Sequence, residues 1–530
     1  MSQASRRAFL RQATALSYMG AASPLGLSLM AMNEAAAQST LTDYKALVCV
    51  FLFGGNDAYN TVLATDTDSW THYTNHRNPA SRNPSDTSTS IALLAPGTAA
   101  NSSAGGGTPA RFGGVLPINH AGRTVHSGRQ FAMHPALTQA QQLHQSGRLA
   151  VLANVGPLTR PTTKADYSNA GFRKPAKLFS HNDQQSTWQA FHPEGAANGW
   201  GGRMGDLLMS RNSSNGAANA DLIRRSFTCM TPTSTSAWLT GQSVMQYQTG
   251  ISSVAGLGSN GRVFGSTQLL SALGQVMTQS SSSNLYVKDH QGFVQRAMNA
   301  SSLLNASIPA VGMAPWGTLN ATNVYTDPLL QYTIPSTNTR GANSLAIQLQ
   351  MVARLIEANR TGGFGIKRQL FMVGMGGFDT HDTQNQNHGN RMAQLDHALA
   401  YFDSVLGSMP GGDMRSQVTT FTASDFGRTF TNNGDGTDHG WGAHHLIMGG
   451  AVRGTEVYGT FPQFSTADGS GNFSSPDQLA NGVMLPTTSV DQYAYTLGKW
   501  MGVSQSDLQS ILPNLSQFNA STHDLGFMLT

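Results

Sequence analysis

Short apolar runs recur along the chain, and each is followed directly by glycine or serine. They lie at 44–53 (YKALVCVFLF), 149–155 (LAVLANV), 369–373 (QLFMV) and 418–423 (VTTFTA). Runs of this length and composition are typical of strands that are covered on both faces of a sheet. Apolar residues at helical spacing occur between them, at 134–146, 345–359 and 391–406. This alternation predicts an α/β fold with a mostly parallel central sheet flanked by helices.

Two long segments interrupt this pattern. Residues 65–128 are rich in Ser, Thr, Asn, Gly and Pro with little periodicity, and residues 200–340 hold only short mixed segments. We expect a single domain over 38–530, with loop and cap insertions at about 65–128 and 200–340. A closing helix is predicted over 491–501, capped by Ser489 or Asp491.

The first 37 residues have the pattern of an export signal. Arg6 and Arg7 precede a mild apolar stretch, and three alanines at 35–37 resemble a signal cleavage site. The pattern predicts a signal peptide over 1–37, read by the twin-arginine export machinery, and a periplasmic or otherwise exported mature protein. No run approaches the ~20 apolar residues that a membrane helix needs, so we expect no stable membrane span.

The composition agrees with export and gives no indication of a nucleic-acid partner. Only 11% of residues are charged, against about 25% in typical soluble proteins. The net charge of +4 gives no electrostatic reason to expect a nucleic-acid partner. The spacing of Cys49 and Cys229 supports neither a disulfide nor a cysteine metal motif.

The stretch from 421 to 450 concentrates groups that bind metals. Asp425 follows the 418–423 run, and the sequence then places Asp438, His439, His444 and His445 within eight residues. Carboxylate oxygen and imidazole nitrogen are ligands for divalent cations, and the intervening glycines allow tight turns. The alternative is a polar surface loop whose histidines form only hydrogen bonds.

Similar residues follow two other predicted strands. Asp57 comes after the first strand, although it also suits a turn or a helix cap, and Asp379 and His381 come after the 369–373 run. The carboxyl ends of parallel strands meet at one edge of a sheet, where ligands bind. We therefore expect one shared metal site, formed by Asp57, Asp379, His381, Asp425 and at least one of His439 and His444.

Ser180 directly precedes a predicted helix that runs towards Trp188. A hydroxyl at this place suits a nucleophile or an anion-binding group. It is equally typical of a helix N-cap.

Seven motifs carry a family resemblance. They are GGNDAYNTV at 54–62, HPAL at 134–137, GRLAVLANVG at 147–156, SHNDQQ at 180–185, GGFDTHDTQ at 376–384, SDFGRT at 424–429 and DHGWGAHH at 438–445. Together they resemble the domain-of-unknown-function 1501 family of twin-arginine-exported bacterial proteins. That family is similar to the alkaline phosphatase and sulfatase superfamily, which implies a metal-centred site at the strand ends.

The superfamily resemblance also implies roles. Asp57 would be the first ligand, Ser180 the counterpart of the nucleophile with Thr61 as its rival, and Asp425 a later carboxylate. Asp379 with His381 would be the middle pair, and His439 or His444 the last imidazole. Phe426 departs from the pattern, because many relatives have histidine there. A second metal would therefore lack a ligand unless His439 or His445 replaced it.

These expectations combine into two functional hypotheses. The first is an exported metal-dependent hydrolase of phosphate or sulfate esters, which acts on a small-molecule or polysaccharide ester with Zn, Mn or Ca. In it, Arg428 or a helix N-terminus would hold the anion. The alternative is a non-catalytic or degenerate metal-retaining periplasmic binding protein, which needs no nucleophile.

Overall fold

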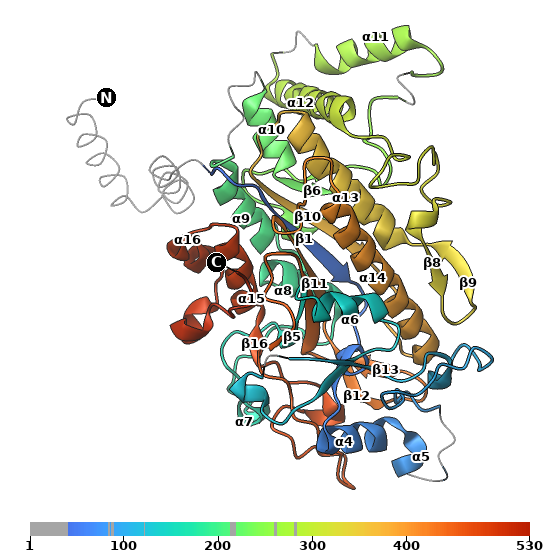
Figure 1. Cartoon of the computed structure of the whole chain (residues 1–530). Coiled ribbons are helices and arrows are strands. Elements are labelled where there is room, and N and C mark those ends of the chain that lie inside the picture. The colour runs from blue at the N-terminus through green and yellow to red at the C-terminus, as the bar shows by residue number, and fades with distance from the viewer. Residues whose placement is uncertain are drawn as a thin grey trace, which may run out of the picture.

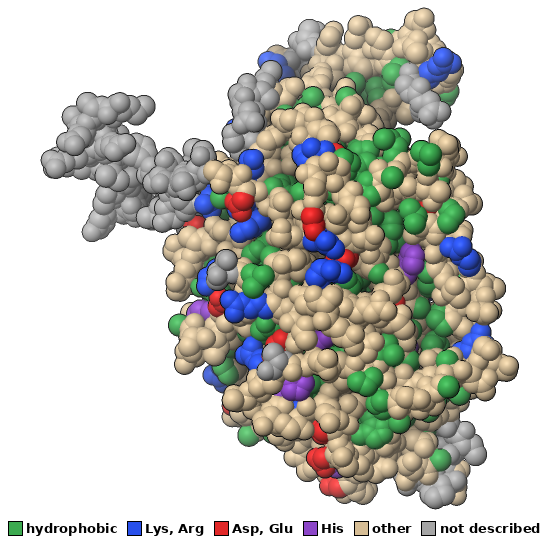
Figure 2. All heavy atoms as spheres, viewed as in Figure 1, with side chains coloured by type: hydrophobic (Ala, Val, Ile, Leu, Met, Phe, Trp, Pro, Cys, Tyr) green, Lys and Arg blue, Asp and Glu red, His purple; other side chains and the backbone are tan. Residues whose placement is uncertain are grey.

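The computed structural model describes residues 41–529 except 83–84, 86–88, 121, 213–218, 259–261 and 280–282. The predicted signal peptide over 1–37 lies outside the described residues. None of the described helices is long and apolar enough to cross a membrane. Figure 2 shows one face of the molecule, where charged side chains lie in small scattered groups, as the low charged fraction of the sequence predicts.

The central sheet of the described chain has nine strands. They are β1 (Lys45–Leu52), β5 (Leu149–Gly156), β6 (Cys229–Thr231), β7 (Tyr247–Gln248), β10 (Arg368–Met375), β11 (Val418–Ser424), β14 (Ala443–Met448), β15 (Val457–Tyr458) and β16 (Thr488–Ser489). Their order is β15-β5-β14-β11-β1-β10-β6-β7, and β16 pairs with β5. Strand β14 is antiparallel to both of its neighbours, whereas the other pairings are parallel. This confirms an α/β fold with a mostly parallel central sheet.

Strand β1 lies between β10 and β11 and is buried on both faces. The even-numbered residues of 46–52 belong to one apolar core, and the odd-numbered residues of 47–51 belong to a second core on the other face. Successive side chains of a strand point to opposite faces, so an uninterrupted apolar run fills both cores. The prediction of a central strand over 44–53 is confirmed.

Helices cover both faces of the sheet. On the first face lie α6 (Thr138–Gln145), α13 (Ser344–Thr361) and α14 (Gln384–Gly407). On the second lie α8 (His181–Ala190), α9 (Trp200–Met209), α15 (Val490–Trp500) and α16 (Gln505–Ile511). Figure 1 shows α13 and α14 side by side on the right, with α9, α15 and α16 on the left. The fold thus has three layers, as the strand and helix pattern predicts.

Smaller elements surround these layers. The helices are α3 (Ala58–Thr61), α4 (Thr67–Arg77), α5 (Pro79–Arg82), α7 (Lys164–Ser168), α10 (Ala220–Phe227), α11 (Thr267–Thr278) and α12 (Leu285–Ser307). The small sheets are β2 (Val62–Ala64), β4 (Phe131–Met133) and β3 (Leu116–Ile118); β12 (Arg428–Asn432) and β13 (Thr437–His439); and β8 (Gln331–Ile334) and β9 (Thr339–Ala342).

The sheet has two features that the sequence pattern did not reveal. The segment 200–340 also contributes β6 and β7 to the central sheet, so it is more than an insertion. Strand β5 runs in the same direction as β1, but β14 and β11 separate the two strands. Strands of two or three residues carry too little pattern to be recognised, and strand order is set by long-range packing.

Cys49 and Cys229 are both free and buried. Burial raises the pKa of both thiols, which keeps them protonated.

The start of α15 gives a test of how this helix is held. The Ser489 hydroxyl accepts a hydrogen bond from the backbone of Asp491, and the Gln492 side chain accepts one from the Ser489 backbone, which forms a capping box. Replacing Ser489 with Ala should lower the free energy of unfolding by about 1 kcal/mol, because a backbone donor of the first turn loses its acceptor. Urea denaturation followed by circular dichroism measures this, with Ser103→Ala at an exposed loop position as the control. An unchanged midpoint for Ser489→Ala would contradict the capping role.

Candidate metal centre

Three neighbouring strands end at the same edge of the sheet and deliver the loops of the site. Leu52 at the end of β1 pairs with Met375 of β10 and with Ser424 of β11. Asp379 lies four residues after β10, and Asp425 directly follows β11. The loop after β1 passes very close to Asp379, because a Cβ at Gly54 would clash with the Asp379 backbone nitrogen and Gly54 has a positive φ of 113°. The strand ends therefore meet as predicted.

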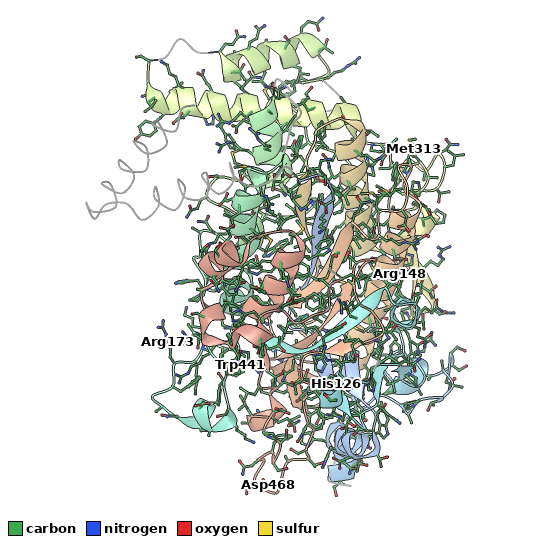
Figure 3. The ribbon with its side chains drawn as sticks, turned by 60° about the vertical axis from the view of Figure 1, so that its left-hand side comes forward. His126, Arg148, Arg173, Met313, Trp441 and Asp468 are labelled. Atoms are coloured by element: carbon green, nitrogen blue, oxygen red, sulfur yellow. The ribbon has the colours of Figure 1, made fainter. Side chains whose placement is uncertain are left out.

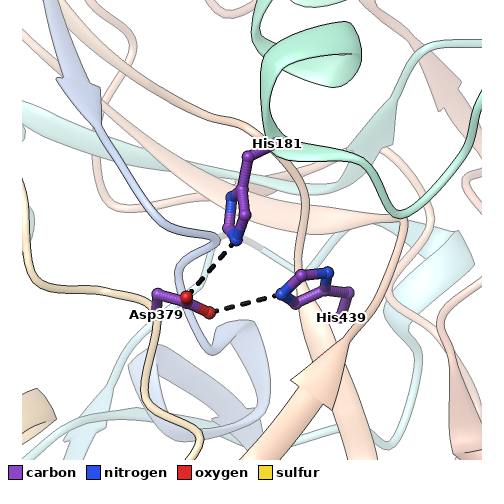
Figure 4. Close-up of side chains that lie close together, drawn as sticks. All are labelled: His181, Asp379 and His439. Atoms are coloured by element: carbon purple, nitrogen blue, oxygen red, sulfur yellow. Dashed lines mark ion pairs between the residues drawn. The ribbon is translucent and has the colours of Figure 1, made fainter.

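Three side chains gather in front of this edge: His181, Asp379 and His439 (Figure 4). Each offers one ligand atom, and these atoms lie within 4.8 Å of one another. The Asp379 carboxylate lies 3.5 Å from Nε2 of His181 and 3.3 Å from Nε2 of His439. His181 is the first residue of α8, and His439 is the last residue of β13. Two imidazoles and one carboxylate thus converge from three separate elements.

Asp425 orients His181. Its Oδ2 lies 2.7 Å from Nδ1 of His181 and also accepts a hydrogen bond from Nε2 of Gln185 at 2.8 Å. The hydrogen bond to Asp425 raises the pKa of His181 and places a proton on Nδ1. Nε2 of His181 is buried and has no hydrogen-bond partner among the described residues. This nitrogen is therefore free to bind a ligand.

A backbone carbonyl orients His439 in the same way. Nδ1 of His439 lies 2.7 Å from the Phe179 oxygen, and a carbonyl only accepts, so Nδ1 carries the proton. Nε2 then points its lone pair towards Asp379. Burial lowers the pKa of His439 and favours the neutral ring that metals bind. Trp441, which is labelled in Figure 3, fixes the segment after His439. It is buried, and its Nε1 donates to the Pro157 carbonyl.

Arg428 holds Asp379 in place. Its Nη1 donates to Oδ1 of Asp379 at 2.7 Å. Burial by itself would raise the pKa of Asp379, but the Arg428 guanidinium outweighs it and holds this pKa below its usual value. The Arg428 side chain is fully buried and also donates to the Gly54 carbonyl and to the Thr437 side chain and carbonyl. Arg428, which was expected to hold an anionic group of the substrate, thus contacts the candidate ligand Asp379.

His381 adjoins the three side chains from the solvent side. Its Nε2 lies 3.0 Å from Nε2 of His439 and 3.1 Å from the Asp379 carboxylate, and its ring is 45% exposed. The Asp438 carboxylate lies 3.4 Å from Nδ1 of His381. If Asp438 holds the proton on Nδ1, two nitrogen lone pairs face each other at 3.0 Å, and a proton or a cation must stabilise them.

Asp57 lies outside this group. Its carboxylate is fully buried and forms an ion pair with Arg77, at 2.5 Å for the shorter contact. Gln384 donates to the same carboxylate, and Asp57 also caps α3 through the Tyr59 backbone. The alternative of a helix cap, left open by the sequence, is therefore what the structure contains. The oxygens of Asp57 already have partners.

The two candidate nucleophiles also have partners. Oγ of Ser180 donates to Asp183 at 2.7 Å, and Ser180 is the N-cap residue of α8. Oγ1 of Thr61 is buried and donates to the Asp57 carbonyl at 2.7 Å. Within the described part of the chain, neither hydroxyl forms a hydrogen bond with His181, Asp379 or His439.

His444 and His445 lie in the protein interior and are not part of the group formed by His181, Asp379 and His439, here called the metal group. Both are fully buried in β14, and burial lowers the pKa of each to about 3. Nδ1 of His444 accepts from the Asn154 backbone, and its ring packs against Phe461. The residues on β14 point into the core layers, so only His439 of the predicted pair reaches the site.

The residues fit one divalent cation and not two. The unpartnered Nε2 of His181 and the inward Nε2 of His439 provide a donor set that suits a metal with mixed nitrogen and oxygen ligands. Two carboxylates expected in the shared site have other partners, because Asp57 pairs with Arg77 and Oδ2 of Asp425 accepts from His181. The ring of Phe426 packs against both His181 and His439, with centroids 4.7 Å and 4.6 Å apart.

The sequence pattern did not single out His181 as a ligand. It directly follows Ser180 in the SHNDQQ motif, and the sequence analysis assigned a possible role to the Ser180 hydroxyl only. A histidine at the first position of a helix that faces strand ends was the signal that could have found it. Its partner Asp425 was recognised, but as a ligand and not as the residue that orients one.

A comparison with protein families supports the resemblance. The family described as protein of unknown function (DUF1501) matches residues 335–512. Over these residues the chain is similar to the DUF1501 family, as its motifs predict. The DUF1501 match includes Asp379, His381, Asp425 and His439, whereas His181 lies before it. No curated protein matches the chain.

The structural role of the Asp57–Arg77 ion pair can be tested separately from the metal group. Replacing Asp57 with Ala should lower the free energy of unfolding by about 3–5 kcal/mol, because it leaves the Arg77 charge buried without its partner. The double variant Asp57→Ala/Arg77→Met removes both charges and should recover much of this loss. Urea denaturation of the single and double variants measures the difference. Equal stability of Asp57→Ala and the wild type would show that the pair is not structural.

Proposed function

We propose that this protein is a metal-dependent hydrolase of phosphate or sulfate esters with one divalent cation held by His181, Asp379 and His439. The observation that carries the proposal is the orientation of the two histidines. Each has its Nδ1 proton bound by an acceptor, Asp425 or the Phe179 carbonyl, and each turns Nε2 towards the same carboxylate. Ligand histidines in metal sites are characteristically held by such partners.

The donor set favours particular cations. Two imidazoles and one carboxylate suit Zn or Mn, whereas Ca takes six to eight oxygen ligands. The choice of esters rests on the resemblance that the motifs imply to the alkaline phosphatase and sulfatase superfamily, and the DUF1501 description itself names no activity. The arginine pair in the leader supports export by the twin-arginine route.

A divalent cation at this place would polarise an ester oxygen and lower the pKa of a water molecule. The protein would supply the proton acceptor and the orientation. The Asp438 carboxylate lies 3.4 Å from Nδ1 of His381, and Nε2 of His381 would take a proton from the attacking water. The water oxygen would bond to phosphorus or sulfur as the ester bond breaks, and the leaving alkoxide would take the proton held on Nε2 of His381. Arg428 keeps Asp379 ionised and fixed throughout.

A metal-retaining protein without turnover is the second candidate. The engagement of both predicted nucleophiles favours it, because Ser180 donates to Asp183 and Thr61 donates to the Asp57 carbonyl. A binding protein needs only the ligand geometry. The two candidates share the metal centre and differ in the role of His381.

The metal centre is tested by ligand substitution. Asp379→Ala and His439→Ala should each weaken Zn or Mn binding by more than about 100-fold, and Asp425→Asn should weaken it by about 10–100-fold, because Asp425 acts through His181. Titration calorimetry of the metal-free chain and elemental analysis of protein purified without a metal-affinity tag provide the measurement. His290→Ala, at an exposed position of α12, is the matched control and should bind as the wild type does. Wild-type protein without stoichiometric metal, or ligand variants that retain it, would refute the centre.

Turnover separates the two candidates. Wild-type protein loaded with Zn or Mn should hydrolyse 4-nitrophenyl phosphate or 4-nitrophenyl sulfate. His381→Gln should lower kcat by about 10²–10⁴ while the metal remains, because it removes the proton acceptor. Ser180→Ala should stay within about tenfold of the wild type, since the Ser180 hydroxyl already donates to Asp183.

Three results would change this assignment. Complete loss of turnover in Ser180→Ala would return the nucleophile to that hydroxyl. Loss of metal from His381→Gln would make His381 a fourth ligand. Metal binding without turnover of either ester would favour the second candidate, a metal-retaining binding protein.

A further inference from the structure

A cavity of about 470 Å³ lies beside the metal centre. One wall is the face of α8 formed by Asn182, Gln185, Ser186 and Gln189, whose spacing places them on one side of the helix. The opposite wall is the loop 233–237 after β6, and the floor includes Phe53 and the end of β10. We call this space the polar cavity. Its size is that of sites for small organic ligands.

The lining of the polar cavity is polar but almost uncharged. Eight of its 14 residues carry a hydroxyl or an amide, and Glu194 is the one charged residue among them. Among the described residues, no lysine or arginine lines the cavity, so an anionic group has no positively charged partner there. An apolar ligand would leave the hydroxyls and amides without hydrogen bonds, which is costly. The lining therefore fits a neutral ligand that both donates and accepts hydrogen bonds.

Several of these polar groups are available. The side chains of Asn182, Ser234 and Thr235 are exposed, and among the described residues they form no hydrogen bonds. Gln185 uses its Nε2 for Asp425 and leaves its amide oxygen as an acceptor. Phe53 adds a half-buried aromatic ring to the floor. Amides and hydroxyls of both hydrogen-bonding types beside an aromatic ring suit a sugar ring, which presents hydroxyl groups at its rim and C–H groups on its face.

The cavity and the metal centre share a wall. Gln185 lines the cavity and donates to Asp425, the same oxygen that holds His181. Asn182 directly follows His181 in the first turn of α8. A small molecule bound in the cavity would thus lie within one helical turn of His181, the candidate metal-binding residue. From this we infer that the polar cavity binds the uncharged sugar part of a carbohydrate phosphate or sulfate ester, an inference that rests on the proposed function.

The test measures sugar binding directly and independently of hydrolysis. The full mature chain, loaded with Zn or Mn, is examined by saturation-transfer NMR with methyl glucoside, methyl galactoside and N-acetylglucosamine, and with cyclohexanol as a probe that lacks the hydroxyl pattern. At least one sugar should bind and cyclohexanol should not. Ser234→Trp, which fills the cavity from an exposed position, and Asn182→Leu, which removes an amide of similar size, should each weaken sugar binding by at least about tenfold.

Controls separate failure of this inference from failure of the proposed function. Asn387→Leu, an exposed position in the first turn of α14 that does not line the cavity, should bind sugar as the wild type does. Metal content should be unchanged in all three variants, because none of these residues belongs to the metal group. Absence of sugar binding, or equal binding by the wild type, Ser234→Trp and Asn182→Leu, would overturn the sugar assignment even if metal and turnover remain. Sugar binding that both cavity variants abolish, in protein that holds no metal, would support the cavity and refute the metal centre.

Discussion

The pairing of one buried carboxylate joins the sheet to the candidate site. Asp425 directly follows the central strand β11 and is fully buried. A carboxylate charge at such a position must be paired. His181 and Gln185, one turn apart in α8, supply its partners. This requirement fixes the first turn of α8 over the end of β11. It thereby sets the direction of the His181 ring and the position of the helix face that forms the polar cavity. The site is thus a consequence of how the sheet neutralises its own buried charge.

Much of the fold follows from local pattern, and the remainder depends on long-range contacts. The strands β1, β5, β10 and β11 are long, apolar and followed by turn residues, and the sequence predicts each of them within a few residues. The antiparallel direction of β14 depends on its partners β5 and β11 and not on its own residues. The short strands β6 and β7 pair at the far edge, where two or three residues give no usable periodicity.

The candidate site shows the same division. Asp379, His381 and His439 were found because carboxylates and imidazoles follow predicted strands, whose carboxyl ends meet at one edge of the sheet. Asp57 has the same local signal, and only the structure reveals that Arg77 occupies its carboxylate. Arg77 lies at the end of a polar helix in a segment without periodicity, so no pattern connects the two residues. His181 escaped notice for the converse reason, since the features of a helix start explain it locally while its role depends on Asp425, more than two hundred residues later.

The two buried thiols have a consequence for where the protein can fold. Cys49 and Cys229 are the only cysteines of the chain, and both lie in the core beneath the helices of the second face. The native state therefore contains no covalent cross-link, and its formation consumes no oxidant. Burial also raises the pKa of both thiols, so the reactive thiolate form is not populated. The folding equilibrium is accordingly independent of redox potential, and the same native structure is compatible with a reducing and an oxidising compartment.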